Sequence, residues 1–226
     1  MATTITPKTA GPSRTVLFVV GAILVAAACG LGALIYFRTE PFAIDEWWNA
    51  LLFSSPVAFL TGFSRVMNFL GAGWFGVLVV PILGAIGLIL LKRPWSAAFF
   101  LTAQAASAGA VQVLKHLFGR ARPEEIIVIS DYGSFPSGHV AGAATLAMAA
   151  FILFPRLWVA LVGIAWVLLM ALSRTALHAH WLTDTIGGAL IGAGMVLIVA
   201  GIFAPLLRRE RPDAAIPASR VTTAPH

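Results

Sequence analysis

Six stretches of the chain are long enough and apolar enough to cross a membrane as helices. A spanning helix needs about 20 mostly apolar residues, because each residue advances the helix by about 1.5 Å. The predicted spans are residues 15–37, 71–91, 95–118, 139–154, 157–177 and 184–206, of which the fourth is the shortest. The pattern therefore predicts an all-α polytopic membrane protein with six transmembrane helices.

The segment between the first two spans has a different character. Apolar residues recur there at helical spacing, and paired tryptophans, Trp47 and Trp48, follow Asp45 and Glu46. Tryptophan beside charged residues is typical of a helix that lies at the membrane interface. We therefore predict an interfacial helical segment between the first and second spans. The alternative is a seventh crossing over about residues 50–70, which would bury Arg65 and Asn68 in the membrane.

Composition agrees with a membrane protein. Of the 226 residues, 59% are hydrophobic and 11% are charged, and the mean hydropathy is +0.92. No polar region is long enough to fold separately, so we expect one membrane domain over residues 15–206. Residues 1–14 form a short N-terminal segment, and residues 207–226 form a tail, rich in Ala, Pro and Thr beyond residue 211, that we expect to be disordered. The only cysteine is Cys29, which excludes an intrachain disulfide.

The distribution of basic residues predicts the orientation. The net charge is +6, but the basic residues are scattered between apolar segments, which excludes a nucleic-acid-binding stripe. Short loops on the cytoplasmic side of a membrane are enriched in Lys and Arg. The basic residues that mark one side are Lys8, Arg14, Lys92, Arg93, Arg156, Arg208, Arg209 and Arg211. Both termini are therefore predicted to be cytoplasmic, in an integral protein of the cytoplasmic (inner) membrane.

Two loops on the opposite side do not follow this charge rule. Lys115 lies at the end of the third span, Arg120 and Arg122 follow it, and Arg174 lies at the end of the fifth. Ionisable groups near membrane depth are energetically costly and are usually functional. We therefore expect a functional site at the outer, periplasmic or exterior, face.

The stretch SRTALHAHWLTD, residues 173–184, contains the first part of that site. On a helix, His180 and Asp184 share a face because they are four residues apart. A carboxylate on one imidazole nitrogen fixes the tautomer and makes the other nitrogen a better nucleophile or base. The alternative is a polar pair that only satisfies its own hydrogen bonds between helices.

The stretch FPSGH provides a second part, because it leads directly into the fourth span. Ser137, Gly138 and His139 are then predicted to lie at a helix N-terminus, where free amides and the helix dipole bind anions. Three cationic side chains are available from two other spans: Lys115, Arg122 and Arg174. Cations, helix-end amides and two histidines suit phosphoryl transfer. The loop carboxylates Glu124, Glu125 and Asp131 are too scattered to predict a magnesium site, so we expect no metal and no cofactor.

Three motifs together resemble the signature of the type 2 phosphatidic acid phosphatase superfamily, which includes vanadium haloperoxidases and glucose-6-phosphatase. They are KHLFGRARP (Lys, six residues, Arg-Pro), FPSGH, and SRTALHAHWLTD (Ser-Arg, five residues, His, three residues, Asp). Each motif alone is weak, but three in this order are specific. The resemblance covers residues 44–206, and its specific part covers residues 115–184.

The resemblance implies a role for each motif residue. His180 would attack phosphorus and carry a phosphohistidine, with Asp184 orienting it, and His139 would protonate the leaving oxygen and then activate water. The groups that would hold the phosphoryl oxygens are Lys115, Arg122, Ser137, Gly138 and Arg174. The chain departs from the family pattern at His178, where many relatives have glycine, and at Leu182, where proline is frequent. These changes affect the shape around the site more than the reaction type.

Four other features have simpler explanations. For His178 and His116, no partner is visible at helical spacing, so we interpret both as interface residues. Arg120 either steers the substrate's head group or is a solvated loop charge. Gly188 and Gly192 form a GxxxG pair that predicts close helix packing.

The leading functional hypothesis is a metal-independent membrane lipid phosphatase. The resemblance implies undecaprenyl diphosphate, phosphatidylglycerol phosphate, phosphatidic acid or lipid A as the lipid, and the sequence does not choose among them. One alternative is a lipid phosphotransferase with the same residues. Others are a phosphatase for a soluble substrate, or a catalytically silent transporter or structural protein. The sequence indicates no partner other than lipid, and no oligomeric state.

Overall fold

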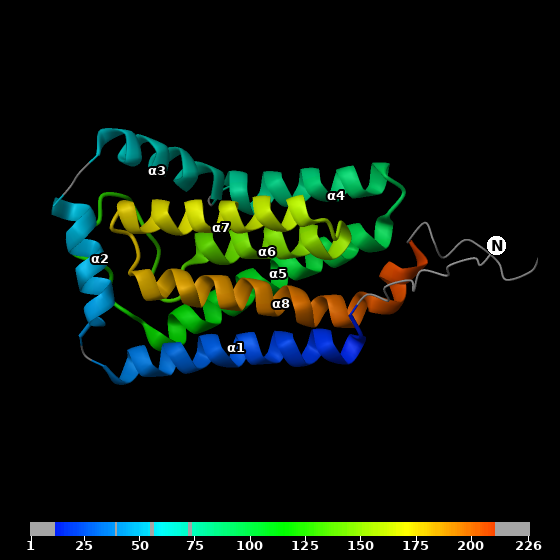
Figure 1. Ribbon diagram of the computed structural model, residues 1–226, viewed down its shortest axis with the longest axis horizontal. Coiled ribbons are helices and arrows are strands. Elements are labelled where there is room, and N and C mark those ends of the chain that lie inside the picture. The colour runs from blue at the N-terminus through cyan, green and yellow to red at the C-terminus, as the bar shows by residue number, and fades with distance from the viewer. Residues whose placement is uncertain (1–11, 39, 55–56, 72–73, 211–226) are drawn as a thin grey trace, which may run out of the picture.

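Every regular element in the computed structural model is helical, within the residues that it describes: 12–38, 40–54, 57–71 and 74–210 (Figure 1). Six helical segments run side by side along the long axis. They are α1 (Arg14–Phe37), the π-helix η1 (Phe75–Val79) continuing as α4 (Val80–Leu90), α5 (Pro94–Phe118), α6 (Gly138–Leu153), α7 (Leu157–Ala176) and α8 (Leu182–Arg209). The helices α2 (Ala43–Ser54) and α3 (Ala58–Gly71) connect α1 to η1. The all-α prediction is confirmed.

The predicted spans correspond closely to these six segments. Four of them, α1, α5, α7 and α8, are long and apolar enough to cross a membrane by length and composition. The segment η1–α4 and helix α6 are apolar but shorter. If the bent pair α2–α3 is counted as one span, the number of candidates is five. Six crossings therefore remain a prediction.

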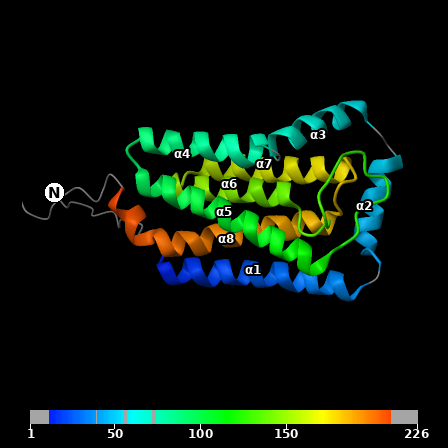
Figure 2. The same ribbon diagram turned by 180° about the vertical axis from the view of Figure 1, so that it is seen from behind.

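The α2–α3 pair does not form a straight seventh crossing. The two helices are bent by 118° relative to one another. Helix α2 lies across one end of the bundle, nearly perpendicular to the long helices, in both views (Figures 1 and 2). We call this end the capped end. Only one residue of α2 is buried, the carboxylate Asp45.

The predicted close packing of α8 is confirmed. A Cβ at Gly188 would lie 2.5 Å from the Ser137 carbonyl oxygen, and a Cβ at Gly192 would lie 2.3 Å from the Ala141 carbonyl oxygen. Both distances are shorter than any real contact, so only glycine permits α8 to approach α6 this closely. The glycines hold α8 against the first turn of α6.

The end of the bundle opposite α2 contains the start of α1 and the end of α8 (Figure 1). Helix α8 extends to Arg209, three residues beyond the predicted end of the span. The Glu210 carboxylate then accepts hydrogen bonds from the backbone N–H groups of Trp95 and Ser96 at the start of α5, at 2.5 and 2.9 Å. The predicted disordered tail begins at residue 207, so the expectation of disorder is wrong for residues 207–209, which are helical. Residues 211–226 of that tail, and residues 1–11 of the N-terminal segment, lie outside the described residues.

Candidate active site

Three connections meet at the capped end: the end of α5 with the loop that follows it, the start of α6, and the turn between α7 and α8 (Figure 2). Helix α5 ends at Phe118, and the residue that caps it, Gly119, has the left-handed φ of 53° that favours glycine at this position. Helix α6 begins at Gly138 with Ser137 as its N-cap, as the sequence predicts. The turn between α7 and α8 contains His180.

His180 is held at one ring nitrogen and presents the other. Its Nδ1 lies 2.8 Å from the Ser134 carbonyl oxygen. A carbonyl oxygen only accepts hydrogen bonds, so Nδ1 carries the proton and Nε2 carries the lone pair. The Arg122 guanidinium lies 3.3 Å from Nε2. The ring is only 3% exposed, and burial lowers the pKa of His180 to about 4. The geometry therefore presents a neutral imidazole whose Nε2 lone pair accepts a hydrogen bond from Arg122, so this bond must be released before Nε2 attacks another group.

Asp184 lies close to His180, but the shortest bond to the ring comes from elsewhere. The distance from His180 Nδ1 to the Asp184 carboxylate is 3.6 Å, longer than the 2.8 Å contact with the Ser134 carbonyl. One reason is that His180 precedes α8, so the pair does not share a regular helix face. The Asp184 carboxylate also accepts a hydrogen bond from the Trp181 backbone N–H at 2.9 Å. The sequence spacing therefore predicts that Asp184 lies near His180, but it does not predict the hydrogen bond to the Ser134 carbonyl.

Two of the three predicted cations share one carboxylate. Lys115 Nζ and Arg122 Nη2 lie 3.2 and 2.9 Å from the same oxygen of Asp131. Both also donate to the Gly133 carbonyl oxygen, at 2.7 and 2.8 Å. Burial opposes ionisation of Asp131, but Lys115 and Arg122 hold its pKa below the ordinary value. The two cations therefore converge on Asp131, and Arg122 also contacts the Nε2 of His180.

Arg174 and His139 meet around a residue of α3. Arg174 is 1% exposed, and its guanidinium donates to the side-chain oxygen of Asn68. Arg174 Nε has no hydrogen-bond partner among the described residues. His139 Nε2 lies 3.2 Å from the Asn68 carbonyl oxygen, to which it donates, so Nδ1 is the atom left for other chemistry. Burying a cation without a paired charge is costly, which favours an anion as its partner.

The start of α6 provides a polar group of its own. Ser137 is fully buried, and its hydroxyl has no hydrogen-bond partner within the described segments. Its backbone N–H donates to the Asp184 carbonyl oxygen at 3.0 Å, which joins the start of α6 to α8. Gly138, at the first turn, lines the same cavity as His139. Free amides at a helix N-terminus suit an anion.

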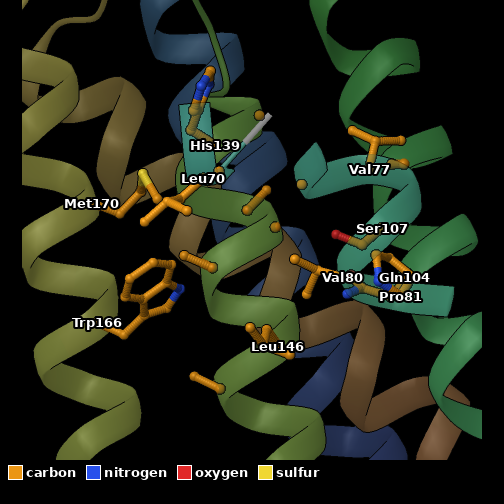
Figure 3. Close-up of a pocket in the computed structure, with 18 of the residues that line it drawn as sticks. Leu70, Val77, Val80, Pro81, Gln104, Ser107, His139, Leu146, Trp166 and Met170 are labelled. Carbon is orange, nitrogen blue, oxygen red and sulfur yellow. The ribbon is translucent and has the colours of Figure 1, made fainter. Parts of the chain in front are cut away.

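A large cavity opens from this cluster into the bundle. Its volume is about 1480 Å³, and Lys115, Gly138, His139, Arg174 and His180 line it at the capped end. In Figure 3, Trp166 and Met170 of α7 lie on one side of the cavity. Val80 and Pro81 of α4 and Gln104 and Ser107 of α5 lie on the other side, with Leu146 of α6 between. The lining continues to Phe154 and Arg156, near the opposite end of α6. The site is therefore the polar end of a long, mostly apolar cavity.

The structure revises the interpretation of Arg120. This residue is neither a solvated loop charge nor placed beside the cavity, because its side chain is 7% exposed and forms ion pairs with Asp45 and Asp184. These partners are 75 and 64 residues away in the chain, so helical spacing cannot find them.

Among the described residues, the two remaining histidines differ from one another. His116 is exposed and stacks on Tyr132, with ring centroids 5.3 Å apart, which agrees with a surface position. His178 is 7% exposed, and its Nδ1 lies 2.7 Å from the side-chain oxygen of Asn49 in α2. His178 therefore has a partner in α2, which helical spacing could not show.

His178 has a left-handed backbone with φ 51°, at the position where the family resemblance predicts glycine. A Cβ at such a position is strained, whereas glycine is not. We expect His178→Gly to be more stable than His178→Ala by about 1 kcal/mol, because both lose the Asn49 bond and only alanine keeps the strain. Thermal unfolding of both variants in one detergent measures the difference. Equal stability, or a more stable alanine variant, would contradict this prediction.

The lowered pKa of His180 predicts how stability depends on pH. The folded pKa is about 4, below the unfolded value of about 6.5. Protonation therefore favours the unfolded chain, and stability that is full above pH 6.5 is lost as the pH falls toward 4. We expect roughly 2–3 kcal/mol from this group. Thermal unfolding of wild type and His180→Gln from pH 8 to 4 isolates this contribution, because glutamine does not titrate. If the stability of both proteins falls equally with pH, the lowered pKa of His180 is refuted.

The side chains of the site can also be compared with those that bind metal ions. In the described part of the chain, no group of three or more His, Cys, Asp or Glu side chains is arranged to hold a metal ion. The groups that face the cavity beside His180 are cationic or neutral, apart from Asp131. The donor set therefore favours an anion.

Comparison with known proteins gives a consistent family. The chain matches the PAP2 superfamily over residues 96–208, which includes every predicted site residue. It is 28% identical over 190 residues to the lipid A 1-phosphatase of Rhizobium etli, covering 77% of this chain and 78% of that protein. It is 33% identical over 145 residues to the decaprenylphosphoryl-5-phosphoribose phosphatase of Mycobacterium tuberculosis, covering 62% of this chain and 78% of that protein.

A solved structure has the same fold. It is the transmembrane PAP2 type phosphatidylglycerolphosphate phosphatase from Bacillus subtilis, with a TM-score of 0.69 and 24% sequence identity. The similarity covers 88% of this chain and 99% of that one. A structural match at 24% sequence identity shows that the two proteins share the same arrangement of helices.

Proposed function

The chain belongs to the PAP2 superfamily of membrane lipid phosphatases, and we propose that it removes a phosphate from a lipid phosphomonoester or diphosphate through a phosphohistidine on His180. The observation that carries the proposal is the neutral His180 ring, whose Nε2 lone pair lies 3.3 Å from the Arg122 guanidinium. Lys115 and Arg174 line the same cavity. A nucleophile beside several cations is what transfer of an anionic phosphoryl group requires.

The proposed reaction has two steps. His180 Nε2 attacks phosphorus, a P–N bond forms, and the P–O bond to the lipid breaks while His139 gives a proton to the leaving oxygen. His139 then takes a proton from water, the water oxygen attacks phosphorus, and the P–N bond breaks to release inorganic phosphate. Because His139 Nε2 donates to the Asn68 carbonyl at 3.2 Å, Nδ1 is the atom that exchanges these protons.

The charge that builds up during both steps falls on the phosphoryl oxygens. Lys115, Arg122, Arg174 and the start of α6 at Ser137 and Gly138 are the groups proposed to hold them. The buried cations provide this stabilisation without a metal ion. A lipid phosphotransferase would use the same groups with a lipid hydroxyl in place of water.

The shape of the cavity supports a lipid substrate. It continues from the cationic end along α6 to Phe154, and most of its lining is apolar. An apolar tail can therefore remain in the cavity while the head group reaches His180. The phosphorylated lipids proposed as substrates are undecaprenyl diphosphate, phosphatidylglycerol phosphate, phosphatidic acid and lipid A.

We propose that six segments cross the cytoplasmic membrane, with both termini in the cytoplasm, and that α2 and α3 lie at the outer interface. The basic side chains Arg14, Lys92, Arg93, Arg156 and Arg208 belong to the ends of helices away from α2, on the side that the charge rule makes cytoplasmic. The active site then faces the periplasm or exterior.

A phosphate-release screen of the purified protein tests the function. The panel contains the four lipid classes and, as a soluble comparison, glucose 6-phosphate. We expect release from at least one lipid, inhibition by orthovanadate as a mimic of five-coordinate phosphorus, and full activity in EDTA. Activity abolished by EDTA and restored by magnesium would contradict the metal-independent mechanism. Labelled lipid product in place of inorganic phosphate would identify a phosphotransferase.

A further inference from the structure

Arg120 bridges two buried carboxylates beside the nucleophile. Its Nη2 lies 2.7 Å from Asp45, and its Nη1 lies 2.6 Å from Asp184. Nη1 also donates to the Thr183 hydroxyl at 2.7 Å. Both carboxylates are fully buried, and the guanidinium packs over the Trp181 ring at 5.5 Å. Such a pair of charge-assisted bonds fixes the Asp184 carboxylate in one orientation.

Arg120 also supports the other group beside His180. The Ser134 backbone N–H donates to the Arg120 carbonyl oxygen at 2.8 Å, and the Ser134 hydroxyl donates to the Ala121 carbonyl oxygen at 3.1 Å. The Ser134 carbonyl in turn accepts from His180 Nδ1 at 2.8 Å. Both neighbours of Nδ1 are therefore linked to Arg120, the Asp184 carboxylate through the guanidinium and Ser134 through the Arg120 backbone carbonyl, and Arg120 occupies one of the six unspecified positions of the first motif.

The second partner of Arg120 comes from the helix across the capped end. Asp45 is the one buried residue of α2. Its carboxylate accepts from Arg120 and also from the Thr183 backbone N–H and hydroxyl, at 2.8 and 2.7 Å. Thr183 lies in the first turn of α8, next to Asp184. Because Asp45 is the only buried side chain of α2, its bonds to Arg120 and Thr183 are what hold α2 against the start of α8.

The charges of this cluster match the proposed chemistry. Two carboxylates and one guanidinium leave one net negative charge next to Nδ1 of His180. When Nε2 attacks phosphorus, the imidazole becomes cationic, and a nearby negative charge stabilises it. Without Arg120, two buried carboxylates would lie close together with no cation between them, which is energetically costly. The guanidinium therefore orients Asp184 and balances part of the buried negative charge.

We propose that Arg120 and Asp45 are positioning residues, which fix the His180 ring through Asp184 and Ser134 and make α2 part of the catalytic apparatus. This inference rests on the proposed function, in which His180 is the nucleophile. Neither residue touches the phosphate, so their loss lowers turnover and leaves phosphate binding intact.

Steady-state kinetics of Arg120→Gln, Arg120→Lys and Asp45→Asn test the inference. We expect kcat to fall about 100-fold for Arg120→Gln and about 10-fold for the other two, as for outer groups that orient a histidine. KM, and the inhibition constant of inorganic phosphate, should stay within about twofold, because Lys115, Arg122 and Arg174 are unchanged. The matched control is Arg38→Gln, which removes an exposed arginine at the capped end and should keep wild-type kcat.

The double variant Arg120→Gln with Asp45→Asn separates positioning from general support of the fold. Asp184 then remains as the single buried charge, so we expect kcat to recover about fivefold over Arg120→Gln alone. A double variant slower than Arg120→Gln, or a phosphate constant that weakens in parallel with kcat, would overturn the inference. So would an Arg120→Gln enzyme with wild-type kcat. If Arg120→Gln does not fold, Asp45→Asn and Arg120→Lys apply the same criteria.

These outcomes are distinct from failure of the proposed function. If wild type releases phosphate and His180→Ala does not, the proposed function holds, and the Arg120 results judge the inference alone. If His180→Ala retains wild-type turnover, the nucleophile assignment fails, and the inference fails with it.

Discussion

Replacing His180 with alanine is expected to lower kcat by about 10⁴-fold or more on every lipid substrate, because the covalent step then has no nucleophile. The fold should persist, since His180 lies in the turn before α8. Phosphate release by the variant, measured over hours against a detergent blank, gives the residual rate. The wild-type enzyme, quenched in alkali during turnover with ³²P-labelled lipid, should retain label on the protein, and the variant should not.

The matched control is His116→Ala. His116 is exposed and stacks on Tyr132, so this variant should keep kcat within about threefold, as surface substitutions do. A His180→Ala enzyme that still turned over at the rate of the control would remove the nucleophile from the mechanism. Labelled protein in His180→Ala would place the phosphoryl group on another residue.

His139→Ala is expected to have the second-largest effect, and one that depends on the leaving group. On a lipid phosphate, kcat should fall by about 10²–10⁴-fold, because the departing alkoxide receives no proton. On an aryl phosphate such as p-nitrophenyl phosphate, departure needs no acid, so the first step should remain fast. The second step still lacks its base. We therefore expect a burst of nitrophenol, close to one per enzyme molecule, followed by slow turnover.

Rapid-mixing absorbance measurements of nitrophenol test this directly. Wild type treated in the same way is the control, and it should show a smaller burst because its second step is fast. Equal losses on alkyl and aryl substrates would mean that His139 does not act as the acid. A loss of binding without a change in kcat would assign it to the phosphate cradle instead.

The fold was largely predictable because the membrane imposes a simple rule on sequence. Apolar runs of the required length locate α1, α5, α7 and α8, and the start of α6 follows from Ser137 and Gly138. The π-helix η1 was not predictable, because i→i+5 bonding leaves no distinct hydrophobic period. The break between α2 and α3 was partly visible, since Arg65 and Asn68 argue against a straight crossing.

The site was predictable where its residues belong to motifs, and unpredictable where it depends on contacts between distant loops. His180, His139 and Arg174 are found from spacing and chemistry. The two histidines are held by the backbone carbonyls of Ser134 and Asn68, which are 46 and 71 residues away, and Arg174 is held by the Asn68 side chain, 106 residues away. Every residue has a backbone carbonyl oxygen, so no sequence pattern predicts which carbonyl accepts these hydrogen bonds. His178 did carry a signal, because the glycine expected there marks a left-handed backbone.

The glycine contact between α6 and α8 has a consequence for how a tail reaches the cavity. With only glycine tolerated at positions 188 and 192 against the α6 backbone, these two helices cannot separate without losing their interface. The opposite wall contains η1, whose i→i+5 bonding interrupts the regular α-helical hydrogen bonds. We therefore expect the cavity to open toward the bilayer beside η1, so that a lipid tail enters from that side only.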